Sequence, residues 1–138
     1  MKILREALGK IFQHCLEGYP YECCGLMIGI EENGRTVLDA VKASNVYAGD
    51  RRVRYLIDPM EYYRVERGAE GRGLRVLGVY HSHPNVPARP SAYDIEQFFP
   101  WYTYLIVSVS DAGVVEYRVW RLEEGGSSRP VEDSLEIS

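Results

Sequence analysis

The sequence predicts an α/β (α+β) fold in which a mixed β-sheet is flanked by helices. The chain has 138 residues, of which 46% are hydrophobic and 26% charged, values typical of one globular domain. Its apolar residues recur at helical spacing in some segments and form continuous, strand-like runs in others. Because the two kinds of segment alternate, helices are expected to pack on a mixed sheet. We assign residues 1–138 to a single domain, with residues 124–138 as a loose tail that adds at most one edge strand.

The first part of the chain predicts a helix and then a hairpin. Apolar residues at helical spacing indicate a helix from Ile3 to about Glu17, followed by a glycine and a proline that end it. Residues 22–30 form a compact apolar run typical of a central strand. The pair Asn33-Gly34 favours a tight turn into a second strand over residues 36–43.

The rest of the chain predicts two further helices and four further strands. Asp58-Pro59 is typical of a helix start, and Pro100 is expected to block the short helix that follows Ser91. Asp111-Ala112-Gly113 indicates a second hairpin. The expected elements are a strand over 54–57, a helix from 58 to about 68, a strand over 74–80, a short helix after 91, and strands over 102–110 and 114–122.

Side chains suited to metal binding follow the strand over residues 74–80. His81 and His83 are two residues apart and therefore share one face of an extended chain. Three prolines then stiffen a short connection that delivers Ser91 and Asp94. Two imidazoles and a carboxylate suggest a metal with three protein ligands and an open fourth position, which is the catalytic zinc pattern.

Ser91 and Asp94 also fit a second interpretation, a box that caps the short helix. Ser91 could belong to both the metal site and the helix cap. Asp94, in contrast, is not expected to face a metal and cap the helix fully at the same time. Its place in a first helical turn favours the ionised form that a metal ligand needs.

A hydrolytic site also requires a proton acceptor, and Glu22 is the candidate. It opens an apolar strand, where a carboxylate without a partner or a task would be costly. The alternative is an ordinary surface glutamate at a strand end. Sequence spacing does not place Glu22 near the histidines.

Several other residues have simpler interpretations. Cys23 and Cys24 are expected to be small buried side chains, although they could line the site or form a second metal site. His14 is expected to be structural or exposed. The cluster Arg51-Arg52-Val53-Arg54 is expected on a solvated strand edge, with an acidic partner as the alternative.

Charge and cysteine content narrow the class of protein. The formal net charge of −4 argues against a nucleic-acid partner, which usually leaves a basic footprint. Three cysteines make a poor disulfide framework and fit a reducing compartment. No apolar stretch approaches the length of a membrane span. We therefore expect a cytoplasmic protein with no membrane or nucleic-acid partner.

The motifs that contain the candidate metal ligands and the candidate base resemble those of one known family. Glu22, the run His81-x-His83-Pro84 and the run Pro90-Ser91-x-x-Asp94 together resemble the JAMM (MPN+) metalloproteases, which include metal-dependent deubiquitinases. Residues 20–26 (Pro-Tyr-Glu-Cys-Cys-Gly-Leu) look like the glutamate strand of bacterial members, and residues 54–59 look like the family's middle segment. The resemblance covers residues 1 to about 120.

The resemblance implies a fold, a cofactor and a role for each residue. The family fold is a mixed sheet flanked by helices, similar to that of cytidine deaminases. His81, His83 and Asp94 would ligate Zn²⁺, Glu22 would be the general base, and Ser91 would hydrogen-bond the oxyanion.

The resemblance also implies a substrate class. The chain lacks the long insertions of eukaryotic deubiquitinases, which points to a minimal prokaryotic member. Its partners would be ubiquitin-like or sulfur-carrier proteins with a C-terminal Gly-Gly. Two alternatives stay open. The first is a non-catalytic scaffold of the same fold. The second is a RadC-like DNA-associated protein, although RadC-type histidine pairs usually bracket an asparagine where this chain has Ser82.

Overall fold

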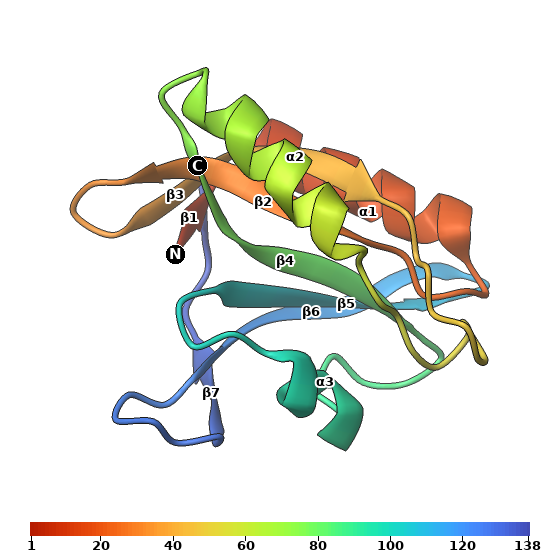
Figure 1. The fold of residues 1–138 in the computed structure, drawn as a ribbon. Coiled ribbons are helices and arrows are strands. Elements are labelled where there is room, and N and C mark those ends of the chain that lie inside the picture. Colours follow the sequence, from red (N-terminus) through yellow and green to blue (C-terminus); the bar gives the residue numbers. More distant parts are fainter.

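An eight-stranded mixed β-sheet runs through the computed structural model, which describes residues 1–138 (Figure 1). The strand order is β7-β6-β5-β4-β2-β3-β1-β8. Strand β4 pairs parallel with β5, and β1 pairs parallel with β3 and β8, whereas the other pairs are antiparallel. The predicted mixed sheet with helices is therefore confirmed.

The elements, in chain order, are β1 (Lys2–Ile3), α1 (Arg5–Gly18), β2 (Cys24–Glu31), β3 (Arg35–Ala43), α2 (Pro59–Glu70), β4 (Arg75–Pro84), α3 (Ala92–Gln97), β5 (Thr103–Ser110), β6 (Gly113–Leu122), β7 (Pro130–Asp133) and β8 (Glu136–Ile137).

Helices cover both faces of the sheet. In Figure 1, α2 lies in front of the central strands β2 and β4, and α1 lies behind them. Each face has its own core: Ile11 of α1 packs with Met27 and Tyr80, whereas Leu26 packs with Tyr55 on the side of α2. Neighbouring residues of a central strand thus belong to opposite cores, as the alternation of side chains along a strand requires. None of the three helices has the length and hydropathy needed to cross a membrane.

Both predicted hairpins are present. Glu31 pairs with Arg35, so residues 32–34 connect the strands, and Asn33 and Gly34 have left-handed φ angles of 52° and 99°, which asparagine and glycine adopt most readily. Gly113 has a φ of 126° at the start of β6, directly after the turn from β5.

Helix α2 begins as predicted, with Asp58 accepting a hydrogen bond from the backbone N–H of Met60. It ends at Glu70 rather than near residue 68. The strand expected over residues 54–57 is wrong. The side chain of Asn45 contacts this backbone: its Nδ2 donates to the carbonyl of Arg54, and its Oδ1 accepts from the N–H of Leu56. These contacts replace a ladder of strand hydrogen bonds.

The two ends of the chain contain strands that sequence reasoning missed. Residues 124–138 were expected to be a loose tail with at most one edge strand, but β7 pairs with β6 at one edge and β8 pairs with β1 at the other. Leu135 and Ile137 pack against the core on the side of α1. This packing stabilises residues 130–138. The strands β7 and β8 are too short to show a clear alternation of apolar residues in the sequence.

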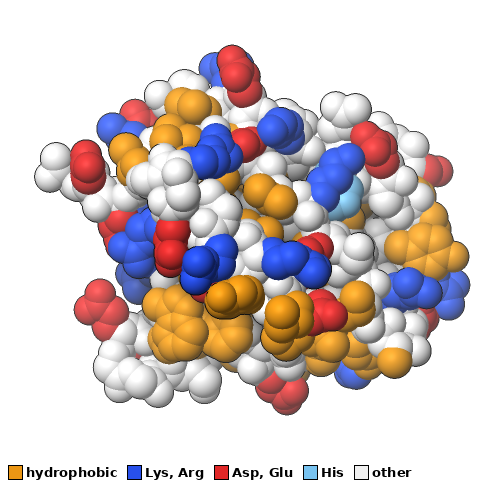
Figure 2. Space-filling view, turned by 45° about the horizontal axis from the view of Figure 1, so that its top comes forward, with side chains coloured by type: hydrophobic (Ala, Val, Ile, Leu, Met, Phe, Trp, Pro, Cys, Tyr) orange, Lys and Arg blue, Asp and Glu red, His pale blue; other side chains and the backbone are white.

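Part of the surface near α2 and α3 is apolar. Figure 2 shows a band of hydrophobic side chains across the lower half of the face that it presents, next to Arg and Lys side chains. The exposed large hydrophobic residues include Met60 and Tyr63 of α2, and Phe99 and Trp101 between α3 and β5.

Close strand packing around Gly78 provides a test of the fold. A Cβ atom at this residue of β4 would lie 1.8 Å from the carbonyl oxygen of Thr103 in β5. Gly78→Ala is therefore expected to lower the free energy of unfolding by about 2–3 kcal/mol, because backbone atoms cannot move aside cheaply. Gly9→Ala is the control: its helical site is open, and the change should raise stability by about 0.5–1 kcal/mol. Urea denaturation measures both, and equal stability of the two variants would contradict this packing.

Candidate active site

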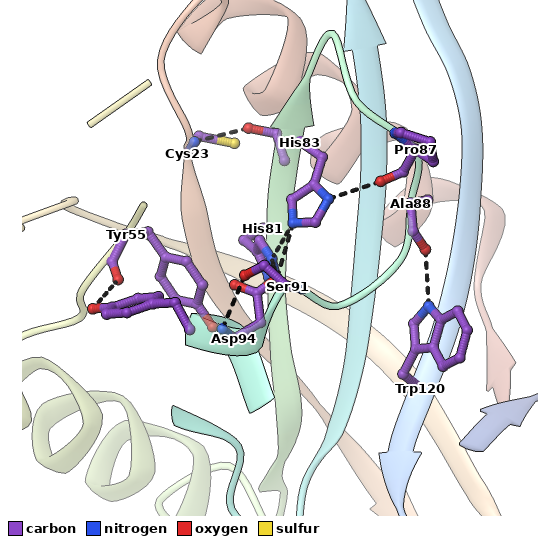
Figure 3. A network of polar contacts seen from close by, with 11 residues as sticks. Cys23, Tyr55, His81, His83, Pro87, Ala88, Ser91, Asp94 and Trp120 are labelled. Carbon is purple, nitrogen blue, oxygen red and sulfur yellow. Dashed lines mark hydrogen bonds and ion pairs between the residues drawn. The ribbon is translucent and has the colours of Figure 1, made fainter. Parts of the chain in front are cut away.

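Three potential metal ligands converge at the end of β4. The Nε2 atoms of His81 and His83 lie 3.2 Å apart, and Oδ2 of Asp94 lies 3.3 Å from the first and 2.9 Å from the second (Figure 3). All three side chains are buried, with exposed fractions of 0%, 4% and 2%. The structure thus brings together the three residues that the sequence singled out as ligands.

The donor set fits a metal ion. Four ligands placed tetrahedrally at about 2.0–2.1 Å from zinc lie roughly 3.3 Å from one another, and the three donor atoms are 2.9–3.3 Å apart. Two imidazole nitrogens and one carboxylate oxygen suit a divalent transition metal. This is the one group of three or more His, Cys, Asp or Glu residues in the chain that could hold a metal ion.

Burial and neighbouring charges have opposite effects on the pKa values of Asp94 and His81. Burial alone would raise the pKa of Asp94, but His81 and His83 hold it well below its usual range. Burial lowers the pKa of His81, and Asp94 opposes that shift only in part. These directions favour an ionised carboxylate and a neutral imidazole, the forms in which both side chains can bind a metal.

Two contacts that the sequence did not reveal orient the histidine rings. Nδ1 of His83 lies 2.8 Å from the carbonyl oxygen of Pro87, an acceptor that orients the ring so that Nε2 faces Asp94 and His81. The ring of Tyr55 stacks on His81 with a centroid distance of 4.4 Å. Nδ1 of His81 has no hydrogen-bond partner, so stacking and burial hold this ring.

Asp94 caps α3 and faces the histidines at the same time. Its Oδ2 accepts a hydrogen bond from the N–H of Ser91, whose Oγ accepts in return from the N–H of Asp94. The expectation that the two tasks compete was wrong, because one carboxylate oxygen has lone pairs for both. Ser91 is exposed, and its hydroxyl accepts one hydrogen bond while its O–H remains available to donate.

The turn that links the histidines to α3 is held by β5 and β6. The indole Nε1 of Trp120 donates to the carbonyl of Ala88 (Figure 3). The N–H of Ala88 donates to Oε2 of Glu116. Ser108 donates to the carbonyl of Val86. The prolines stiffen this turn, but these hydrogen bonds set its position on the sheet.

The fold places Glu22 on the same side of the sheet as the ligands. Cys24 of β2 pairs with His81 of β4, and the register continued by two residues sets Glu22 opposite His83. The N–H of Cys23 donates to Oγ of Ser82, and the N–H of Ser82 donates to the carbonyl of Cys23. Glu22 precedes β2 rather than opening it.

Glu22 is buried, which makes the alternative of a surface glutamate wrong. Its side chain is 5% exposed, and its Oε1 has no hydrogen-bond partner. Burial, followed by the charges of Asp94 and Cys23, raises its pKa to about 9. The side chain of Asn45 fixes this segment by donating to the carbonyl of Glu22. A buried, unpartnered carboxyl group beside a cluster of candidate metal ligands is typical of a functional residue.

The remaining singled-out residues lie outside the cluster. Cys24 is a core residue, and Cys23 contacts Cys15 rather than the candidate metal ligands. His14 bonds through Nδ1 to the hydroxyl of Tyr80 at 2.6 Å. The arginines at 51, 52 and 54 are exposed on a loop, not on a strand edge.

Known proteins resemble this chain in sequence. The profile of a family described as prokaryotic homologs of the JAB domain matches residues 4–123. A desampylase from Haloferax volcanii is 38% identical over 113 residues, which cover 78% of this chain and 80% of the relative. A probable TtuB-protein conjugate cleaving protease from Thermus thermophilus is 38% identical over 94 residues, which cover 67% of this chain and 60% of the relative.

The likeness extends to three dimensions. The solution structure of a protein from Desulfitobacterium hafniense is 26% identical and aligns with a TM-score of 0.86. The alignment covers 100% of this chain and 93% of that one. Sequence and fold therefore agree over nearly the whole chain.

The free energy of unfolding of the metal-free protein should report the burial of Glu22. Its pKa is about 9 in the folded protein and about 4.5 when unperturbed. Between these values the unfolded chain has lost the proton and the folded protein keeps it, so rising pH favours unfolding. Relative to Glu22→Gln, the free energy of unfolding should fall by about 1.4 kcal/mol per unit between pH 5 and 8.

Urea denaturation of both metal-free proteins at several pH values measures this difference. Parallel pH profiles for the wild type and Glu22→Gln would contradict a buried, protonated Glu22.

Proposed function

The chain belongs to the prokaryotic JAB-domain branch of the JAMM metalloproteases, and from this premise we propose that it is a zinc-dependent hydrolase of ubiquitin-like or sulfur-carrier conjugates. The bond cleaved is the peptide or isopeptide bond that follows a C-terminal Gly-Gly. The convergence of His81, His83 and Asp94 beside a buried glutamate carries this proposal.

His81, His83 and Asp94 hold the zinc ion in this proposal. Bound zinc supplies a Lewis acid that polarises a carbonyl group and makes water a nucleophile near neutral pH. The protein contributes the orientation of the donors: the carbonyl of Pro87 fixes His83, the ring of Tyr55 fixes His81, and the N–H of Ser91 fixes Asp94.

Glu22 transfers the proton. Its carboxylate takes a proton from the attacking water and passes it to the departing amine, because an amine leaves readily only when protonated. Burial raises the pKa of Glu22 in the metal-free protein, and the positive charge of bound zinc would lower it again, so that the carboxylate can accept a proton. A positioned general base contributes about 10²–10⁴-fold to the rate.

Ser91 stabilises the developing negative charge. Its Oγ accepts from the N–H of Asp94, which leaves the hydroxyl proton directed elsewhere and free to donate to the oxyanion of the tetrahedral intermediate. Loss of one such donor costs roughly 10²–10³-fold in rate where it has been measured.

Two observations support the proposal that the substrate is a protein: the names of the relatives and an apolar hollow in the surface. The names of both relatives, a desampylase and a protease that cleaves TtuB-protein conjugates, describe removal of a conjugated protein. Tyr55, which stacks on His81, also lines a hollow together with Tyr62, Phe99 and Trp101. Phe99 and Trp101 are exposed, and exposed aromatic side chains suit the apolar surface of a carrier protein.

Defined substrates test the proposed reaction. Zinc-loaded protein should release the amine from a Gly-Gly carrier of the same genome, presented either with residues added after Gly-Gly or joined to a lysine. Mass spectrometry identifies the products, and a chelator should abolish cleavage. If every such carrier stays intact while zinc is bound, the proposed function is wrong. A protein without zinc and without activity would favour the scaffold alternative.

Two variants separate metal binding from proton transfer. Glu22→Gln should keep stoichiometric zinc and lose at least about two orders of magnitude in kcat, because it keeps the shape of the side chain without the base. Asp94→Ala should weaken zinc binding itself. Metal analysis and kinetics measure both effects. Unchanged turnover in Glu22→Gln would remove that residue from the proposed role.

A further inference from the structure

Two buried thiols lie next to each other one residue away from Glu22. Sγ of Cys15, in the last turns of α1, is 3.4 Å from Sγ of Cys23. Their exposed fractions are 0% and 7%. Both belong to the core on the side of α1, and no disulfide joins them. The proposed mechanism assigns neither thiol a role.

A hollow in the surface makes Cys23 accessible. Glu22, Cys23 and His14 line this hollow, which has a volume of about 560 Å³. A small polar oxidant such as hydrogen peroxide can therefore approach Cys23 from the solvent, whereas Cys15 is fully buried and does not line the hollow. The hydrogen bond with Cys15 lowers the pKa of Cys23, which favours its nucleophilic thiolate form.

We propose that Cys15 and Cys23 form an oxidisable thiol pair that peroxide converts into a disulfide, which reversibly switches off the neighbouring site. The Cys23 sulfur attacks one peroxide oxygen and becomes a sulfenic acid as the O–O bond breaks and water leaves. The Cys15 sulfur then attacks the Cys23 sulfur, and the hydroxyl group leaves as a second water molecule. Two thiols are oxidised, one peroxide is reduced, and the protein loses two hydrogen atoms.

The disulfide would disturb the position of Glu22. A disulfide brings its sulfurs to about 2.05 Å, so the present separation of 3.4 Å must shorten. Cys23 is hydrogen-bonded on both backbone sides to Ser82, which lies between the two histidines. A shift of Cys23 is therefore transmitted to Glu22 and to β4, and misplacement by 1 Å can cost about 10²-fold in rate.

Cys24 is a matched control. It follows Cys23 directly, but its side chain points into the opposite core, where its sulfur lies 3.9 Å from the carbonyl oxygen of Ala43. It is fully buried and faces neither Cys15 nor the hollow. Cys24→Ala should therefore leave the oxidation of the pair unchanged.

Peroxide treatment of the zinc-loaded protein tests this inference. We expect the intact mass to fall by the mass of two hydrogen atoms. Digestion should yield a peptide that links Cys15 to Cys23, and activity should fall at least about tenfold. Reduction with a phosphine that carries no thiol should restore both mass and activity. Cys24→Ala should respond in the same way, whereas Cys15→Ala should be active when reduced and form no linked peptide.

Two results would overturn the inference: thiols that stay reduced under peroxide, or a Cys15–Cys23 disulfide that leaves activity unchanged. The effect on activity rests on the proposed function, but the linked peptide is detected by mass alone. Inactivity of the reduced, zinc-loaded protein would therefore count against the proposed function and not against the thiol pair.

Discussion

One carboxylate oxygen connects the parts of this site. Oδ2 of Asp94 lies within 3.3 Å of both histidine Nε2 atoms and accepts a hydrogen bond from the N–H of Ser91. A buried carboxylate without such partners would be costly, so the end of β4 and the first turn of α3 must meet at this point. The turn between them depends in turn on β5 and β6, through the hydrogen bonds of Ser108 and Trp120.

Glu22 reaches the same point by a different route. The antiparallel pairing of β2 with β4 sets the register, and the hydrogen bonds between Cys23 and Ser82 extend that pairing beyond the strand. Asn45 then ties the Glu22 segment to the loop that carries Tyr55. The candidate ligands and the proposed base are thus separate in sequence and are brought together by the pairing of β2 with β4 and by the hydrogen bonds of Ser82 and Asn45.

The sequence predicted those parts of the site that depend on local spacing. The histidine pair and the serine-aspartate box could be recognised because residue spacing fixes which side chains share a face or a helical turn. The contacts of Tyr55 with His81 and of Asn45 with the Glu22 segment could not, because they join segments whose separation in space depends on the whole sheet. The terminal strands escaped prediction for the same reason: β8 forms only beside β1, at the other end of the chain.

We propose that the donors of His81, His83 and Asp94 hold zinc beside the buried carboxyl group of Glu22. Anomalous diffraction at the zinc edge, recorded from crystals of the zinc-loaded protein, tests it most directly. We expect one peak at about 2.0–2.2 Å from Nε2 of His81, Nε2 of His83 and Oδ2 of Asp94, with the carboxyl group of Glu22 facing the open side of the metal. A zinc ion bound at Cys15, Cys23 and His14, or an empty cluster in zinc-saturated crystals, would contradict this account.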